Sequence, residues 1–235
     1  MRAKPLYHTT GLLLRFLFLA LLLVQDLAAG GTPVGDYLDR PEQRHFDIYR
    51  EGRHIGTHTI SRRKLDDRLV VEARTRISVG LLGFELYRFL YDTREVWDGH
   101  GLLQLVASVD DDGKQTSIEG KRTGDRFVWS DGRTERSHAM PVYPTNHWNA
   151  GVLGQNAVLN TLTGKINNVT ILDEGRETLE HTGSSQPALR YRYDGELKLV
   201  SWYDSQGRWL AMRFTTDDGS TIEYRCRNCT GQATL

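Results

Sequence analysis

Apolar and polar residues alternate with period two along much of the chain. From residue 69 to residue 79 the odd positions hold Leu, Val, Ala, Thr, Ile and Val, while charged residues such as Glu72 and Arg74 occupy even positions. The stretches 189–193 and 210–214 repeat this alternation. Successive side chains of a strand point to opposite faces of a sheet, so the pattern predicts half-buried antiparallel strands.

Glycine-centred turns separate these stretches. Several are Asp-Gly pairs, which favour hairpin turns because both central positions adopt positive φ. These pairs are Asp98-Gly99, Asp112-Gly113, Asp131-Gly132, Asp194-Gly195 and Asp218-Gly219. Roughly ten to twelve strands at this spacing predict a mostly β fold, a curved antiparallel sheet that forms a half-barrel or an open barrel. We expect residues 42–235 to form this single β domain.

The segment 140–162 interrupts the alternation. It contains two prolines, and Trp148 and Val152 have rough helical spacing. We interpret it as a proline-rich crossing followed by a short helix or helical turn, with Thr145 or Asn146 as a possible N-cap. In a β protein such a segment often covers an open end or a concave face, so we expect one short helix to cover the sheet.

The first thirty residues have the pattern of a secretory signal peptide. Basic residues precede a purely apolar run at 16–24, and small residues follow, with Ala28 and Gly30 in the small-x-small arrangement. A retained membrane anchor is the alternative, but the run is shorter than the roughly 20 residues that a spanning helix needs. We therefore predict cleavage after residues 1–30, a flexible segment 31–41, no stable membrane span afterwards, and export to the periplasm or the extracellular space.

The charge balance and the two cysteines limit which partners and which chemistry the protein can have. The chain carries 30 Lys and Arg against 30 Asp and Glu, without a basic block, so we expect no nucleic-acid partner. The two cysteines, Cys226 and Cys229, follow a strand-like run near the C-terminus. We expect a structural disulfide in an oxidising compartment. A redox-active pair, free thiols or a metal site that recruits ligands from elsewhere are the alternatives.

The strongest catalytic candidate is His147, with Asn146 or Asn149 to orient its imidazole. No nucleophile motif accompanies it, and a buried histidine satisfied by neighbouring amides explains the same residues. His54 and His58 have a spacing that binds zinc on a helix, but in a strand they lie roughly 13 Å apart, so we interpret them as a solvated face. We expect no metal and no cofactor.

Aromatic residues suggest a binding function. Candidate ligand contacts are Tyr87, Phe89, Tyr91, Phe127, Trp129 and Trp148. A curved sheet lined by such side chains and partly covered by a helix forms a pocket for an apolar ligand. The alternative is that the same residues are an ordinary β core.

Three stretches resemble a family of uncharacterised exported bacterial β proteins, a domain of unknown function. They are the early hairpin Phe46–Gly56, the segment Trp148–Gly164 with Leu159–Gly164 as its most characteristic part, and the late hairpin Trp202–Phe214. The arrangement is distantly similar to the periplasmic half-barrels that carry lipoproteins or other lipids. That similarity implies a fold and assigns no binding residue, because folds do not fix function.

These observations favour an exported, monomeric envelope protein that binds an apolar or lipid-like ligand without catalysis. Buried apolar area, at roughly 25 cal/mol per Å², would drive capture of an acyl chain. The alternatives are an enzyme centred on His147 and an interaction or scaffold protein that joins envelope partners through exposed strand edges.

Overall fold

The computed structural model describes residues 42–229, except residues 83, 182, 183 and 228. The predicted signal peptide at 1–30 and the predicted flexible segment at 31–41 lie outside the described residues. No helix in the described part of the chain is long and apolar enough to cross a membrane.

The described residues form one antiparallel sheet of 14 strands and a single short 3-10 helix, η1 (Ala150–Gly154). The strands are β1 (Glu42–Arg50), β2 (Arg53–Leu65), β3 (Arg68–Leu81), β4 (Phe84–Asp98), β5 (Gly101–Asp111), β6 (Lys114–Thr123), β7 (Arg126–Ser130), β8 (Glu135–Ala139), β9 (Ala157–Asn160), β10 (Lys165–His181), β11 (Ser184–Gly195), β12 (Leu199–Tyr203), β13 (Trp209–Thr215) and β14 (Thr221–Cys226). The mostly β prediction is confirmed, with more strands than the turn spacing suggested.

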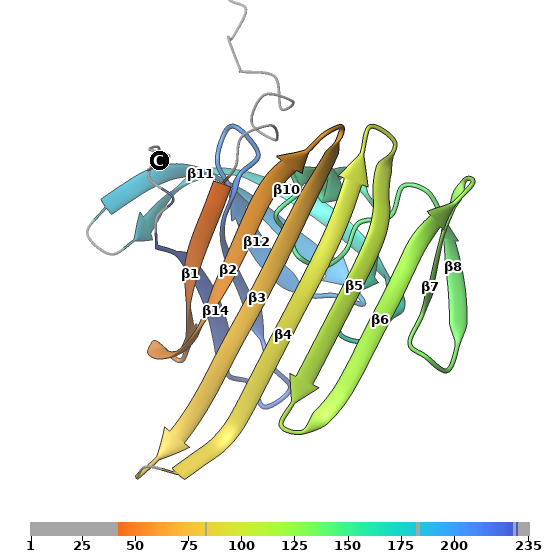
Figure 1. Cartoon of the computed structure of the whole chain (residues 1–235). Helices are drawn as coiled ribbons and strands as arrows, with labels where there is room; N and C mark the ends of the chain where they lie inside the picture. Colours follow the sequence, from red (N-terminus) through yellow and green to blue (C-terminus); the bar gives the residue numbers. More distant parts are fainter. Residues whose placement is uncertain (1–41, 83, 182–183, 228, 230–235) are drawn as a thin grey trace, which may run out of the picture. The chain divides into compact units, whose positions relative to one another are not determined.

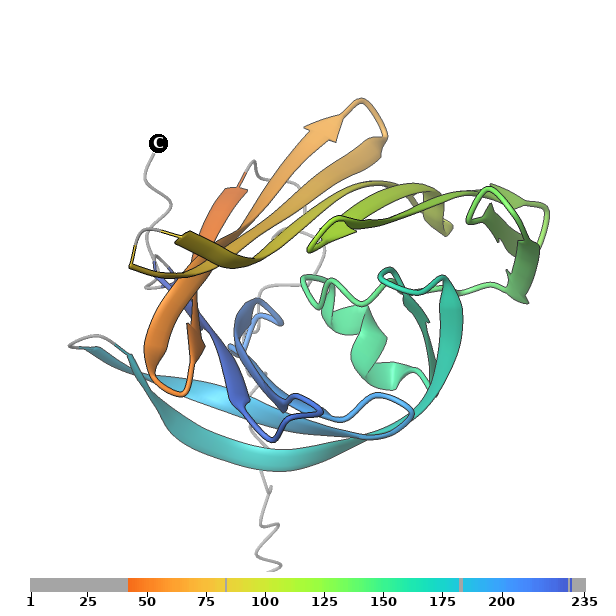
Figure 2. The same ribbon diagram turned by 90° about the horizontal axis from the view of Figure 1, so that it is seen from below.

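The topology is two meanders joined at β1 and β14. From β1 the chain adds strands in order to β8, crosses over, and then adds β9 to β14, which pairs with β1 (Figure 1). The sheet is therefore not closed, and its two edges, β8 and β9, are consecutive along the chain. The crossing segment 140–156 joins them, and η1 lies inside the curve of the sheet (Figure 2).

One row of paired residues shows how the period-two pattern forms the core. Ile60, Ala73, Thr93, Ala107 and Ile118 are neighbours across β2 to β6, and all are buried on the inner face. On β3 and β4 the positions on either side of this row are charged and face outward, for example Arg74 and Asp92. The predicted alternation is confirmed. The register of these strands is fixed because a one-residue shift in any of them would move its apolar side chains to solvent.

The crossing segment is less helical than its sequence suggested. Only residues 150–154 are helical, and Asn149 is the N-cap, accepting a hydrogen bond from the Gly151 backbone N–H at 2.9 Å. Residues 157–160, within the stretch predicted to contain the helix, form β9 instead. Leu159 pairs with Tyr143 and Thr145 through backbone hydrogen bonds, so sheet pairing decides this element.

A β-bulge in β2 corrects the interpretation of its two histidines. The pairing changes from Ile48–Gly56 to Tyr49–His54, which leaves Ile55 as the extra residue. His54 consequently faces outward and is exposed, whereas His58 lies buried on the inner face. The pair is therefore not one solvated face, because a bulge reverses the alternation between them.

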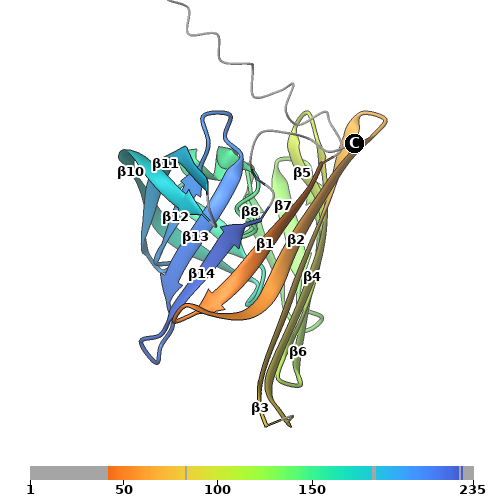
Figure 3. The ribbon, with the colours of Figure 1, turned by 90° about the vertical axis from the view of Figure 1, so that its left-hand side faces the viewer.

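The same region splits the sheet. The ladder between β2 and β3 ends at the pair Gly56–Ile77, and that between β4 and β5 ends at Phe89–Asp111. The β3–β4 hairpin extends beyond both pairs and projects past the ends of β1 and β2 (Figure 3).

Candidate functional site

A groove with a volume of about 420 Å³ lies at this split between β2 and β3. It is lined by His54, Ile55, Gly56, Arg76, Ile77, Ser78, Glu85, Arg88 and Leu90. Its volume falls within the range of roughly 300–1,000 Å³ that small-molecule sites occupy. The groove forms because the bulge at Ile55 directs the first residues of β2 away from β3, while β3 and β4 stay paired beyond this point.

The groove combines apolar side chains with paired charges. Ile55, Ile77 and Leu90 are half-buried and supply the apolar part. Arg76 donates two hydrogen bonds to the Asp92 carboxylate, at 2.7 and 2.8 Å, and so places a cation beside them. This arrangement suits an amphipathic molecule, with its apolar part on the isoleucines and leucine and its polar part at the rim.

A second cation, Arg88, lies on the same face of β3 and β4 as Arg76, since Arg76 pairs with Leu90 and Ser78 pairs with Arg88. Arg88 forms an ion pair with Asp110 at 3.2 Å, and its side chain is nearly half exposed. His54 lies 3.2 Å from Asp47, whose pKa is lowered chiefly by a hydrogen bond from Arg227. The rim therefore presents charges that already have partners, so polar recognition would be weak compared with apolar contact.

Ile77 also belongs to an inner strip of half-buried apolar residues. The strip consists of Ile77, Val79, Tyr87 and Phe89, on the projecting part of β3 and β4. The Tyr87 hydroxyl donates a hydrogen bond to Asp111 at 2.8 Å, and burial raises the pKa of Tyr87 well above its ordinary value. Two of the six predicted ligand contacts, Tyr87 and Phe89, are thus accessible next to the groove.

The other four predicted contacts, Tyr91, Phe127, Trp129 and Trp148, are buried in the core. The Tyr91 hydroxyl lies 2.6 Å from the Thr161 hydroxyl, and the indole N–H of Trp129 donates to the Gly164 carbonyl at 2.8 Å. Such residues position the sheet and the crossing segment, and they are not exposed to a ligand in this structure.

Glu95 organises the polar part of this core. Its side chain is fully buried, and the indole N–H groups of Trp97 and Trp148 donate to it at 2.7 and 2.9 Å. The Asn146 amide donates to its other oxygen and also to the Thr93 hydroxyl. Burial raises the pKa of Glu95, and the three N–H donors oppose that shift. The network fixes the crossing segment to β4.

His147 lies beside this network and is only 5% exposed. It adopts a positive φ of 58°, and its ring packs against Tyr193 and Trp209. Burial lowers the pKa of His147 to about 4, so the imidazole is neutral at physiological pH. Its Nδ1 atom has no hydrogen-bond partner within the described residues, and Tyr203 donates to its backbone carbonyl at 2.9 Å.

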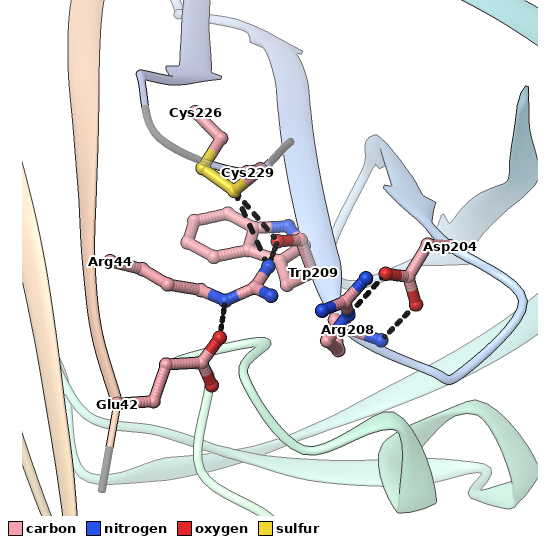
Figure 4. Close-up of a disulfide and its surroundings, with 7 residues drawn as sticks. All are labelled: Glu42, Arg44, Asp204, Arg208, Trp209, Cys226 and Cys229. Atoms are coloured by element: carbon pink, nitrogen blue, oxygen red, sulfur yellow. Dashed lines mark hydrogen bonds and ion pairs between the residues drawn. A yellow bond between two sulfur atoms is a disulfide. The ribbon is translucent and has the colours of Figure 1, made fainter. Parts of the chain in front are cut away.

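A third cluster surrounds the C-terminal disulfide (Figure 4). Cys226 and Cys229 are bonded, with their Cα atoms 5.7 Å apart, as predicted. Arg44 is buried and donates to the Trp209 carbonyl at 2.8 Å and to the Cys229 sulfur at 3.3 Å. Glu42 accepts from Arg44 at 2.5 Å, so the cluster joins the start of β1 to the residues after β14.

A recess next to this cluster, lined in part by Arg44 and Arg62, has a volume of only about 10 Å³. That is close to the volume that one water molecule needs. No group of three or more His, Cys, Asp or Glu side chains within the described residues could hold a metal ion. Another groove, of about 190 Å³, lies against Leu179, Trp202 and Met212. The groove at the split is larger than either and is the candidate site.

Sequence reasoning missed the groove residues Ile55, Arg76, Arg88 and Leu90. A bulge in β2 creates the groove, and Gly56 beside it was a usable signal, because a glycine inside a strand pattern indicates a bulge or a close backbone approach. The largely apolar run at 79–87 was a second signal that this region is exposed for binding, because apolar residues continue through a turn, where polar residues are usual.

The fold and the groove define a class: an open, barrel-like antiparallel sheet whose interior is packed. Among solved structures, a crystal structure of a beta-barrel-like protein of a domain of unknown function, DUF1849, from Brucella abortus shares this fold. Its TM-score is 0.57 at 9% sequence identity, and the match covers 80% of this chain and 96% of that one. At this identity the likeness shows the fold alone.

The family model described as a domain of unknown function, DUF6134, matches residues 46–227. The chain belongs to this family. None of the curated proteins matches the chain.

Proposed function

We propose that this protein binds an amphipathic, lipid-like ligand in the groove at the split between β2 and β3, without catalysis. One observation carries the proposal: a groove of about 420 Å³ meets the half-buried inner strip at Ile77. Tyr87 and Phe89 extend the same apolar surface toward the hairpin tip. A ligand chain that covers these side chains removes their apolar area from water.

The proposal includes export to the bacterial envelope. The disulfide between Cys226 and Cys229 supports it, because such bonds persist in oxidising compartments. The predicted signal peptide supports it as well.

Catalysis at His147 is not part of this proposal. Asn146 and His147 are 4% and 5% exposed, and side chains of the core surround both. A general base must reach its substrate within hydrogen-bond distance. Asn149 caps η1 and so has a structural role.

The test is a titration with N-phenyl-1-naphthylamine, a probe that fluoresces in apolar sites, followed by displacement with palmitate. We expect saturable binding by the wild-type protein. In the double variant Ile55→Ser, Leu90→Ser the affinity should fall about tenfold, because two apolar contacts are lost.

The matched control is Leu172→Ser, which changes an exposed leucine on β10, away from the groove. It should bind as the wild type does. Equal affinity in the groove variant and the control would place the ligand elsewhere and overturn the site, and absence of saturable binding would overturn the function.

A further inference from the structure

The tip of the β3–β4 hairpin carries the most exposed large apolar side chains of the described residues. Leu82, Phe84 and Leu86 are 89%, 74% and 61% exposed, whereas Leu65, at another hairpin turn, is 49% exposed. Apolar side chains that gather in this way mark an interaction site. We infer that this tip inserts into the interfacial region of a phospholipid bilayer.

The tip can reach a surface because it projects. Residues 78–82 and 84–88 lie beyond the last β2–β3 pair, Gly56–Ile77, and the last β4–β5 pair, Phe89–Asp111. At about 3.3 Å per residue, five further residues extend roughly 16 Å past these pairs. The tip therefore contacts a flat surface before the turns on either side.

The composition of the tip suits lipid. Between Val79 and Tyr87, Glu85 is the only charged residue, and Ser78 donates a hydrogen bond to it at 2.9 Å. Tyr87 lies at the base of the tip, and a tyrosine ring is favourable at a membrane interface because one end is apolar and the other polar.

The backbone limits the depth of insertion. Within the described residues, no strand pairs with the outer edges of residues 78–81 and 84–87. Their free N–H and C=O groups would be costly in the hydrocarbon core, where no water can satisfy them. The tip consequently stays at the boundary between headgroups and acyl chains.

The size of the tip favours a bilayer over a protein partner. A stable protein interface buries about 800 Å² on each partner, more than three side chains at a narrow turn provide. The same side chains hold about fifteen carbon atoms, close to one myristoyl chain, which gives weak and reversible membrane binding with a constant of about 10⁴ M⁻¹.

Charge near the tip selects the lipid. Asp110, Asp111 and Asp112 lie at the end of β5 and in the turn after it, beside the base of the hairpin. Arg88 pairs with Asp110, and Lys114 is the cross-strand partner of Asp111, so one carboxylate of the three is left as a net negative charge. Anionic headgroups would be repelled, and we therefore assign a zwitterionic phospholipid surface.

The backbone at Leu82 provides a way to separate lipid binding from folding. Leu82 has a φ of 53°, a left-handed conformation that disfavours a bulky residue and suits asparagine. In the full chain, Leu82→Asn should bind phosphatidylcholine vesicles less tightly, by about threefold or more, while its melting temperature stays equal or rises.

A label at the tip tests insertion directly. Phe84→Cys is labelled with an environment-sensitive fluorophore, and Leu65→Cys carries the same label as the matched control. With phosphatidylcholine vesicles, we expect a blue shift and quenching by lipid-bound nitroxide at position 84 but not at position 65. Both variants are full-length chains with the same predicted leader. Membrane association through the leader would therefore affect both labels and cannot produce a difference between them.

Three results would overturn the inference: equal responses at both positions, a response that requires added phosphatidylglycerol, or a response without vesicles that follows self-association of the chain. Insertion of the tip does not depend on a ligand in the groove. Loss of probe binding in the groove variant and loss of insertion at the tip are therefore separate outcomes.

Discussion

At the scale of single residues, the interior holds both paired and unpaired polar groups: Nδ1 of His147 and Nε2 of His58 have no hydrogen-bond partner within the described residues. Glu95 is fully buried, and three N–H donors surround its carboxylate. His58 and His147 are buried as neutral imidazoles, and the Thr75 hydroxyl lies 2.8 Å from Nδ1 of His58. The residues next to His147 in the sequence made it a catalytic candidate, with a buried structural histidine as the alternative. The tertiary structure decides between them, because the ring is buried and packs in the core.

The buried histidines predict that stability falls in mild acid. Burial lowers the pKa of His147 to about 4 and that of His58 to about 3, against about 6.5 in the unfolded chain. Below pH 6.5 the unfolded chain binds protons that the folded chain does not. The free energy of unfolding should thus decrease from pH 6.5 to pH 4, by up to about 1.4 kcal/mol per pH unit for each histidine.

Urea unfolding at several pH values measures this slope. His147→Asn, which tolerates the positive φ, should reduce the slope near pH 5 by up to about 1.4 kcal/mol per pH unit. An unchanged slope in His147→Asn would mean that the imidazole is accessible to protons in the folded protein.

At the scale of elements, the bulge in β2 shapes the candidate site. Period-two alternation correctly predicted β3, yet it failed between His54 and His58, because one extra residue reverses the faces. The crossing segment shows a second limit. Its prolines and spacing predicted an irregular covering element, but the choice between helix and strand at residues 157–160 came from pairing with β10.

Gly56 tests the close approach at the split. A Cβ atom built at Gly56 would lie 2.2 Å from the Arg76 carbonyl oxygen, which is backbone and cannot rotate away. We expect Gly56→Ala to lower the free energy of unfolding by roughly 2 kcal/mol or more, since the two strands must move apart.

Gly99→Ala is the matched control, because no atom lies within 4 Å of its added Cβ and its φ is not positive. Its unfolding free energy, measured by urea titration, should stay within about 0.5 kcal/mol of the wild type. Equal stability of the two variants would contradict the close packing of β2 on β3.

At the scale of the whole described domain, contacts distant in sequence hold the sheet together. Phe46 pairs with Cys226, and an ion pair joins Asp47 to Arg227. At the opposite edges, Trp129 on β7 donates to Gly164 in the turn after β9. This contact bridges the open side of the sheet next to β8 and β9.

Removing that bridge should loosen the edges selectively. Trp129→Phe leaves the buried Gly164 carbonyl without its donor, which costs about 1–3 kcal/mol. Hydrogen exchange should become faster in β7, β8 and β9, while β2 and β3 keep their protection.

Trp202→Phe is the matched control, since it removes an indole that donates to Glu177 in the middle of the second meander. In the Trp202→Phe variant, amide hydrogen exchange should become faster only around β10 to β12. Equal loosening of β2 and β3 by Trp129→Phe would show that the edge contact supports the entire sheet.

The sequence by itself determined the strand-rich class, the faces of most strands, the hairpin turns and the irregular crossing segment, because these depend on local periodicity and turn chemistry. The disulfide was also predicted from the sequence, because the expected export places Cys226 and Cys229 in an oxidising compartment. Only the tertiary structure decided which aromatics are buried, where β2 and β3 separate, and that the β3–β4 tip projects. Those features depend on pairing between strands and on sheet curvature, and residues far apart in the chain set both.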